Sequence, residues 1–142
     1  MLLFEKVTPA FCDVLSVLHA SCFDKPWDKD AFSSLLSLPT TSGLINDKAF
    51  ILCSVCLDEA EILTIGVVPE ARQQGIGLEL LNQMQALLKE QGVSKFFLDV
   101  NEKNMAARKL YAKFGFLQVG LRKGYYIENG QKFDALLLKK YI

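Results

Sequence analysis

The residues best suited to chemistry form a short turn, rich in glycine and carrying one cation, directly before a long apolar-periodic segment. They are Arg72, Gln73, Gln74, Gly75, Ile76 and Gly77. An apolar run at residues 62–68 precedes the turn and predicts a buried strand. The first N–H groups of a helix lack intrahelical partners and carry partial positive charge, which attracts anions. Because glycines allow close approach and a guanidinium suits phosphate oxygens, the turn predicts a phosphate site.

A second block, residues 101–116, reads Asn-Glu-Lys-Asn-Met-Ala-Ala-Arg-Lys-Leu-Tyr-Ala-Lys-Phe-Gly-Phe. It resembles the Asn-x-x-Ala-x-x-Leu-Tyr-x-x-x-Gly-Phe segment of the GCN5-related N-acetyltransferase (GNAT) superfamily, and residues 72–77 resemble that superfamily's pyrophosphate loop. Matches at residues 26–27, 58–61 and 122–126 resemble its ribosomal-protein-alanine N-acetyltransferase branch. The resemblance covers nearly the whole chain. It implies an N-acetyltransferase with acetyl-CoA as co-substrate.

The same resemblance implies roles for individual residues. Tyr111 is expected to protonate the departing thiolate, and its position within the matched motif favours this role over the alternative of a tyrosine packed in the core. The acceptor groove is expected to contain Trp27, Tyr125 and Tyr126. The cofactor is expected to contact Ile65, Gly66, Val67, Arg72, Gln73, Gln74, Gly75, Ile76, Gly77 and Asn104, with backbone N–H groups of residues 65–67 facing the oxyanion. Gly66 marks either a bulge or packing under a bulky neighbour.

The general base is where the sequence departs from the resembled branch. That branch has glutamate within Leu-Glu-Val on the strand before the second block, and this chain has Asp99 there. Aspartate is one methylene shorter, so its carboxylate sits about 1.5 Å further back, which favours contact through a water. Glu61 is the rival, because the histone-acetylating branch draws its base from that strand position. Either carboxylate could instead be an exposed strand residue.

The demand on the base depends on the acceptor amine. An α-amino group has a pKa near 8 and lysine one near 10.4, so roughly a tenth of N-termini are neutral at pH 7 but far fewer lysines. A weakly placed base therefore favours an α-amine, and the resemblance implies the N-terminal alanine of a small-subunit ribosomal protein. The alternatives are acetylation of a small amine or of lysine side chains, and a weakly catalytic acyl-CoA-sensing module.

Composition sets further bounds. The chain has 142 residues, 51% of them hydrophobic, and equal numbers of acidic and basic residues, so it is expected to form one N-acetyltransferase domain over residues 1–142 without a nucleic-acid partner. No apolar run reaches the ~20 residues that cross a bilayer, and the N-terminus lacks signal-peptide features. A cytoplasmic location and no membrane partner are expected. Cys53 and Cys56 lie three apart in a predicted strand and so face opposite sides, which argues against a metal site.

Periodicity and turn signals predict the elements that position these residues. Helices are expected at residues 8–22, 28–38, 76–91 and 104–114. Strands are expected at residues 42–46, 50–57, 61–67, 95–100, 116–122 and 133–141. A strand that follows a helix implies a parallel neighbour and a right-handed crossover. The predicted architecture is the α/β (α+β) GNAT fold, with a mixed, mainly antiparallel sheet flanked by helices on both faces.

Overall fold

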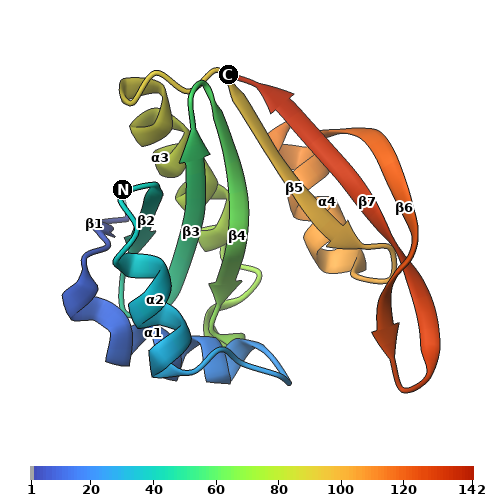
Figure 1. The fold of residues 1–142 in the computed structure, drawn as a ribbon, viewed down its shortest axis with the longest axis horizontal. Coiled ribbons are helices and arrows are strands. Elements are labelled where there is room, and N and C mark those ends of the chain that lie inside the picture. The colour runs from blue at the N-terminus through green and yellow to red at the C-terminus, as the bar shows by residue number, and fades with distance from the viewer. Residues whose placement is uncertain (1) are drawn as a thin grey trace.

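The structure is a computed structural model that describes residues 2–142. It contains a seven-stranded sheet of order β1-β2-β3-β4-β5-β7-β6 (Figure 1). The strands are β1 (Glu5–Lys6), β2 (Thr41–Ile45), β3 (Ala49–Cys56), β4 (Glu59–Val67), β5 (Lys95–Asn101), β6 (Leu117–Glu128) and β7 (Gln131–Tyr141). The helices are α1 (Cys12–Cys22), α2 (Lys29–Leu36), α3 (Ile76–Glu90) and α4 (Met105–Phe114), with short 3-10 turns at Pro9–Phe11 and Pro69–Ala71.

Helices cover both faces of the sheet, as the sequence predicts. Figure 1 shows α1 and α2 in front of β2, β3 and β4, with α3 behind these strands and α4 behind β5 and β7. The buried stripe of α3 includes Leu80, Leu81, Met84 and Leu88. All strand pairs are antiparallel except β4 with β5. The predicted mixed, mainly antiparallel sheet is therefore confirmed.

The parallel pair β4–β5 is short. Only three residues of each strand are in register, from Glu59 opposite Lys95 to Glu61 opposite Phe97. Beyond these residues the two strands separate, which Figure 1 shows as a widening gap toward the carboxyl ends of β4 and β5. Within residues 2–142, the last six residues of β4 have no strand partner on their β5 side. The backbone polar groups on that side are therefore available to a ligand.

A bulge in β4 lies just before this free segment. Leu52 of β3 pairs with Thr64, whereas the next residue, Cys53, pairs with Ile62. Leu63 is thus an extra residue, and a bulge of this kind changes which side chains face which side of the sheet. Beyond the bulge, Thr64 faces α1. The predicted irregularity in this strand is present, but it lies at Leu63 and not at Gly66.

The hairpin β6–β7 is the second irregular part of the sheet. Arg122 pairs with Ala135 and Tyr126 pairs with Phe133, so three residues of β6 lie opposite the single residue Asp134. The Gly124 N–H donates to Asp134 Oδ1 (2.9 Å), and the Asp134 N–H donates to Glu102 Oε2 (2.8 Å). Gly124 has φ +61°, a conformation that favours glycine. This closed bulge lets β6 continue to Glu128, six residues beyond its predicted end.

Other boundaries differ modestly from the predictions. Thr8 does cap a helical turn, but this turn is a 3-10 segment and α1 begins only at Cys12. The two-residue strand β1 was not predicted, since its partner β2 lies almost forty residues further along the chain. Among residues 2–142, no helix combines the length and apolar character needed to cross a membrane.

Candidate active site

A cavity of about 550 Å³ opens where β4 and β5 separate. Its walls come from the end of α1, the end of β4, the turn before α3, the first turn of α3 and one side of α4. Of the ten residues predicted to contact the cofactor, nine line it: Ile65, Gly66, Val67, Arg72, Gln73, Gly75, Ile76, Gly77 and Asn104. The structure thus brings together two blocks that are about thirty residues apart in sequence.

The start of α3 is the part of this cavity that suits an anion. Asp28 caps α2 and Asn104 caps α4, and each accepts a hydrogen bond from a backbone N–H of the first turn. The residue at the corresponding position before α3 is Gly75, which has no side chain to form such a cap. The Glu79 N–H donates to the Gly75 carbonyl, and the preceding N–H groups of this 15-residue helix point out of its end. These donors and the helix dipole favour phosphate.

Arg72 is fixed at the edge of this turn. Its Nε donates to the Val67 carbonyl at 2.9 Å, so one guanidinium nitrogen ties the turn to the end of β4. Gln73 has φ +63°, which is unusual for a residue with a side chain and shapes the turn around the cavity. Gln74 does not line the cavity, because its amide nitrogen turns back to the Glu70 carbonyl (3.5 Å). The predicted contact of Gln74 therefore finds no side-chain support.

Tyr111 lies on the α4 wall of the cavity. Only 6% of its surface is exposed, and its ring packs edge-on against Phe116 at 5.8 Å between ring centroids. Burial raises the pKa of the Tyr111 hydroxyl, and the nearby Tyr126 raises this pKa further. The phenol therefore keeps its proton at neutral pH. Tyr111 is part of the core and also lines the cavity, so its position is compatible with both interpretations, and its role as an acid stays a prediction.

Gly66 is packed beneath a bulky neighbour. It pairs with Phe50 across the β3–β4 ladder, and a Cβ built on Gly66 would lie 2.7 Å from Phe50 Cζ and 3.1 Å from Cys22 Sγ. Of the two interpretations of this glycine, close packing is the one that these contacts describe. The packing brings Phe50 and Cys22 against β4 where it borders the cavity.

Both candidate base residues lie on one face of the sheet where the strands begin to separate. Glu61 is opposite Phe97, and Asp99 is two residues beyond Phe97 and so projects to the same side. Partial burial raises the pKa of Glu61, the negative charge of Asp99 raises it further, and the Arg122 guanidinium partly offsets both effects. The charge of Asp99 therefore acts on Glu61, which is not an isolated surface group.

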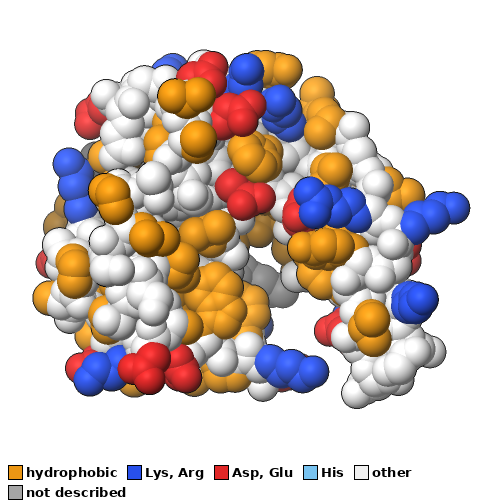
Figure 2. Space-filling view, viewed as in Figure 1, with side chains coloured by type: hydrophobic (Ala, Val, Ile, Leu, Met, Phe, Trp, Pro, Cys, Tyr) orange, Lys and Arg blue, Asp and Glu red, His pale blue; other side chains and the backbone are white. Residues whose placement is uncertain are grey.

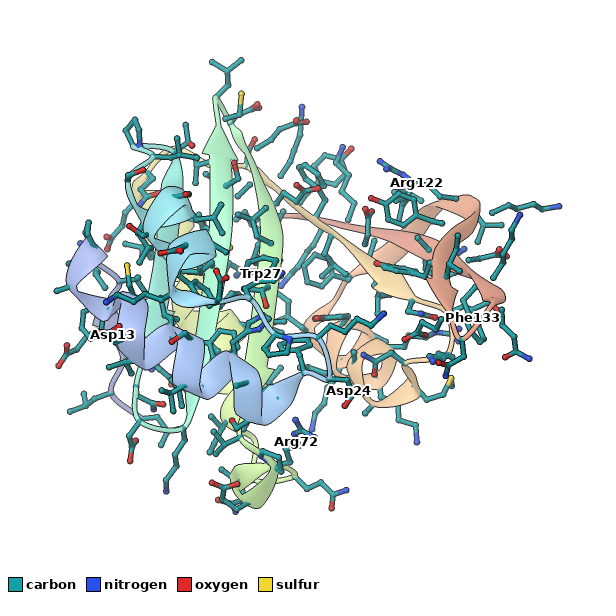
Figure 3. The ribbon with its side chains drawn as sticks, turned by 60° about the horizontal axis from the view of Figure 1, so that its bottom comes forward. Asp13, Asp24, Trp27, Arg72, Arg122 and Phe133 are labelled. Atoms are coloured by element: carbon teal, nitrogen blue, oxygen red, sulfur yellow. The ribbon has the colours of Figure 1, made fainter. Side chains whose placement is uncertain are left out.

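The bulge of β6 places aromatic side chains over these carboxylates. Tyr125 and Tyr126 meet edge to face at 5.2 Å between ring centroids, and the Arg122 guanidinium lies 5.3 Å from the Tyr125 ring. Burial raises the pKa of Tyr126, and so does the charge of Asp99. Figure 2 shows the molecule hollowed between this part of β6–β7 and the α1–α2 side. In Figure 3, Trp27 and Arg122 lie on opposite sides of this hollow.

Trp27, the third predicted groove residue, is partly buried at the α1–α2 side. Its ring stacks with His19 at 5.0 Å and meets Phe32 at 5.6 Å between ring centroids. His19 itself is buried, with 3% of its surface exposed, and its Nε2 lies 3.1 Å from Thr64 Oγ1. Its partner Thr64 is 45 residues away in sequence, so nothing local to the histidine could reveal the contact.

The four cysteines differ from one another in burial and position within the described part of the chain. Within residues 2–142, no group of three or more His, Cys, Asp or Glu side chains is placed to hold a metal ion. Cys53 is buried and Cys56 is exposed, as their opposite facing predicts, and all four cysteines are free.

The fold, the uncapped glycine turn at the start of α3 and the separated strands define an acetyltransferase of the GNAT type. The model of the acetyltransferase (GNAT) family matches residues 18–116, and the chain belongs to this family. It is therefore an N-acetyltransferase, and the resemblance to the GNAT superfamily predicted from its two motifs is confirmed.

Its relatives place it more narrowly. It is 37% identical over 127 residues to a Bacillus subtilis protein provisionally named [ribosomal protein bS18]-alanine N-acetyltransferase, covering 85% of this chain and 83% of the relative. It is 33% identical over 120 residues to the Escherichia coli (strain K12) [ribosomal protein bS18]-alanine N-acetyltransferase, covering 80% and 79%. The crystal structure of the Escherichia coli ribosomal-protein-S18-alanine N-acetyltransferase is similar with a TM-score of 0.89 and 26% identity, covering 99% of this chain and 93% of that one.

The anion site at the start of α3 can be tested with two matched substitutions. Gly75 and Gly92 flank the two ends of α3, both have positive φ (79° and 85°), and a Cβ on either meets nothing within 4 Å. Gly75→Asp puts a carboxylate where the phosphate is expected, so affinity for CoA should fall by about tenfold or more in calorimetry. The left-handed backbone at residue 75 strains any side chain, but a carboxylate at this helix start interacts favourably with the helix dipole, so the melting temperature should fall less than in the control variant Gly92→Asp.

Gly92→Asp is the control for backbone strain. It places the same side chain in the same backbone conformation at the far end of the helix, where a negative charge opposes the dipole. This variant should lose thermal stability and keep its affinity for CoA. Equal affinity of the two variants for CoA would contradict an anion site at the start of α3.

Proposed function

We propose that the protein transfers the acetyl group of acetyl-CoA to the N-terminal α-amine of a protein, as its named relatives do for ribosomal protein bS18. The observation that carries the proposal is a pair of sites that meet where β4 and β5 separate. The α3 side offers donors for phosphate, and the opposite side offers two carboxylates beneath aromatic side chains. A substrate amine and a thioester could therefore meet within the sheet.

The residues suit direct attack by the amine. Glu61 takes the amine proton, and the raised pKa that burial and Asp99 give it makes it a stronger base than an ordinary glutamate. The free edge of β4 at residues 65–67 provides backbone N–H groups near the reacting carbonyl. Tyr111, which stays protonated, supplies a proton to the departing thiolate. Both substrates are bound at once, and no covalent enzyme intermediate forms.

The acceptor is expected to be a chain terminus with a small first residue. Glu61 and Asp99 attract an ammonium group, and Trp27, Tyr125 and Tyr126 surround an extended peptide from both sides of the hollow. The N-terminal alanine of a small-subunit ribosomal protein is the acceptor that the named relatives suggest.

The function is tested with three peptides of one sequence that contains an internal lysine. One has a free N-terminal alanine, one has that α-amine blocked, and one has the lysine replaced by norleucine. Because far more of the α-amine than of the lysine is neutral at pH 7, the first and third peptides should react alike and the blocked peptide should lose nearly all activity. Equal rates for the blocked and free peptides would indicate a lysine acetyltransferase. Tight CoA binding without turnover on any amine would indicate a sensor.

The identity of the base is tested through the acidic limb of the pH profile of kcat/KM, which reports the base in the free enzyme. Asp99→Asn removes a charge that raises the pKa of Glu61, so the limb should move to lower pH. Arg122→Gln removes a charge that lowers this pKa, so the limb should move to higher pH. Glu61→Gln should reduce kcat by about 10²- to 10⁴-fold. If Asp99→Asn produces that loss and Glu61→Gln does not, Asp99 is the base.

The role of Tyr111 is tested with Tyr111→Phe, which keeps the packing against Phe116 and removes only the hydroxyl. Because the hydroxyl acts when the thiolate departs, kcat should fall by about 10²- to 10⁴-fold while affinity for CoA stays within about twofold. Tyr141→Phe is the control, since Tyr141 is exposed at the end of β7 and should show wild-type rates. A loss under about threefold in a stable Tyr111→Phe variant would leave Tyr111 a packing residue.

A further inference from the structure

His19 is the only histidine of the chain, and it is buried between the loop at residues 24–27 and strand β4. Its ring stacks on Phe23 at 4.3 Å and on Trp27 at 5.0 Å between ring centroids. Phe32 of α2 and Phe50 of β3 close the remaining sides at 5.4 and 5.6 Å. The imidazole therefore lies in an aromatic cage formed by the loop, α2 and β3.

Two hydrogen bonds define the state of this imidazole. The Trp27 backbone N–H donates to His19 Nδ1 (3.0 Å), so Nδ1 must be unprotonated. The neutral ring then carries its proton on Nε2, which donates to Thr64 Oγ1 (3.1 Å). One ring thus connects the backbone of the loop to the strand that borders the cavity. Both ring nitrogens are satisfied only when the ring is neutral.

The bond to Nδ1 is the main attachment of the loop. Within residues 2–142, it is the one hydrogen bond that joins the backbone of residues 24–27 to the rest of the fold. Phe23, at the start of the loop, lines the cavity, and Trp27, at its end, lies beside the hollow opposite Arg122. Phe23 has its own backbone hydrogen bond, from its N–H to the His19 carbonyl (3.0 Å), so a change in the bond to Nδ1 acts on the Trp27 side of the loop.

We propose that His19 is a positioning residue, which holds Trp27 and its loop against the acceptor through Nδ1 and releases them when the imidazole is protonated. The part that concerns the acceptor rests on the proposed function. Protonation places a hydrogen on Nδ1, which then opposes the Trp27 N–H and cannot accept from it. The loop is thus held at neutral pH and released in acid.

The surroundings fix the direction of this pH dependence. Burial lowers the pKa of His19 below its ordinary value of 6.5. The groups that contact the ring from α2, β3, β4 and the loop are Phe32, Phe50, Thr64, Phe23 and Trp27, and all are uncharged. The charged side chains of the adjoining loop, Asp24, Lys25 and Asp28, are exposed. Protonation of His19, and with it the release of the loop, therefore occurs below pH 6.5. No neighbouring carboxylate raises the pKa of His19.

Two amide variants separate positioning from packing. In His19→Asn the amide oxygen takes the approximate place of Nδ1 and can still accept from the Trp27 N–H, whereas His19→Gln places its amide near Nε2 and leaves the N–H without an acceptor. His19→Gln should raise KM for the peptide about five- to tenfold with kcat within about threefold, and His19→Asn should restore KM to within about threefold of wild type. Equal KM values for the two variants would contradict positioning through Nδ1.

Thr64→Val controls for stability alone. It removes the partner of Nε2 and keeps the bond to Trp27, so it should lower the melting temperature and leave KM for the peptide within about threefold. A rise in KM equal to that of His19→Gln would show that general loosening, and not the bond to Trp27, sets the affinity for the acceptor.

The sole tryptophan provides a readout that does not depend on activity. Acrylamide quenching of Trp27 fluorescence should increase in the wild type as the pH falls below about 6.5, and His19→Asn should show no such step because an amide does not titrate. An identical step in His19→Asn would overturn the proposed release. If the wild type shows the step but acetylates no peptide, the proposed function fails and the switch in the loop stands.

Discussion

The separation of β4 from β5 is the constraint on which the rest of the structure depends. A parallel pair that ends after three residues leaves backbone N–H and C=O groups of β4 without a sheet partner. Such groups are costly in a dry core but useful beside a ligand. The remaining elements compensate: α3 and α4 form the cavity on one face, while the loop before α2 and the bulged β6 border the hollow on the other. The sheet is interrupted between β4 and β5, and the resulting passage lies between the cavity on one face and the hollow on the other.

Helix termini are used in two ways around this passage. The side chains of Asp28 and Asn104 satisfy N–H groups of α2 and α4, which stabilises helices of eight and ten residues. The longer α3 has no such cap on its first N–H groups. Burial of six of its side chains stabilises the helix and offsets the missing cap. Gly77 contributes to the same arrangement, because a Cβ there would lie 3.0 Å from Leu110 Cδ2, and the glycine lets this side chain of α4 pack closely against the first turn of α3. The cavity therefore exists because two helices approach closely at an uncapped end.

Local patterns were sufficient to predict most elements and most cavity residues. Capping residues, a glycine turn and apolar periodicity act over a few positions, so Asp28, Asn104 and residues 72–77 could be recognised in the chain itself. Contacts between distant segments could not. His19 and Thr64 are far apart in sequence, the extra residue Leu63 appears only when β3 and β4 are aligned, and β6 passes Gly124 only because Asp134 accepts its N–H. Each of these depends on the completed sheet, and each lies next to the site.

Opposing charges beside the passage keep the pKa of Glu61 from rising as far as burial and Asp99 alone would take it. A lone buried glutamate risks too high a pKa, because a base that stays protonated at neutral pH cannot accept a proton. Asp99 pushes the pKa of Glu61 up, Arg122 pulls it down, and the same two residues act in the same directions on Tyr126. Asp99 thus has an electrostatic effect on Glu61 and Tyr126 whether or not it accepts the proton of the amine itself. The proposed assignment of the base to Glu61 places the proton acceptor on the neighbouring strand β4, the strand whose end borders the cavity.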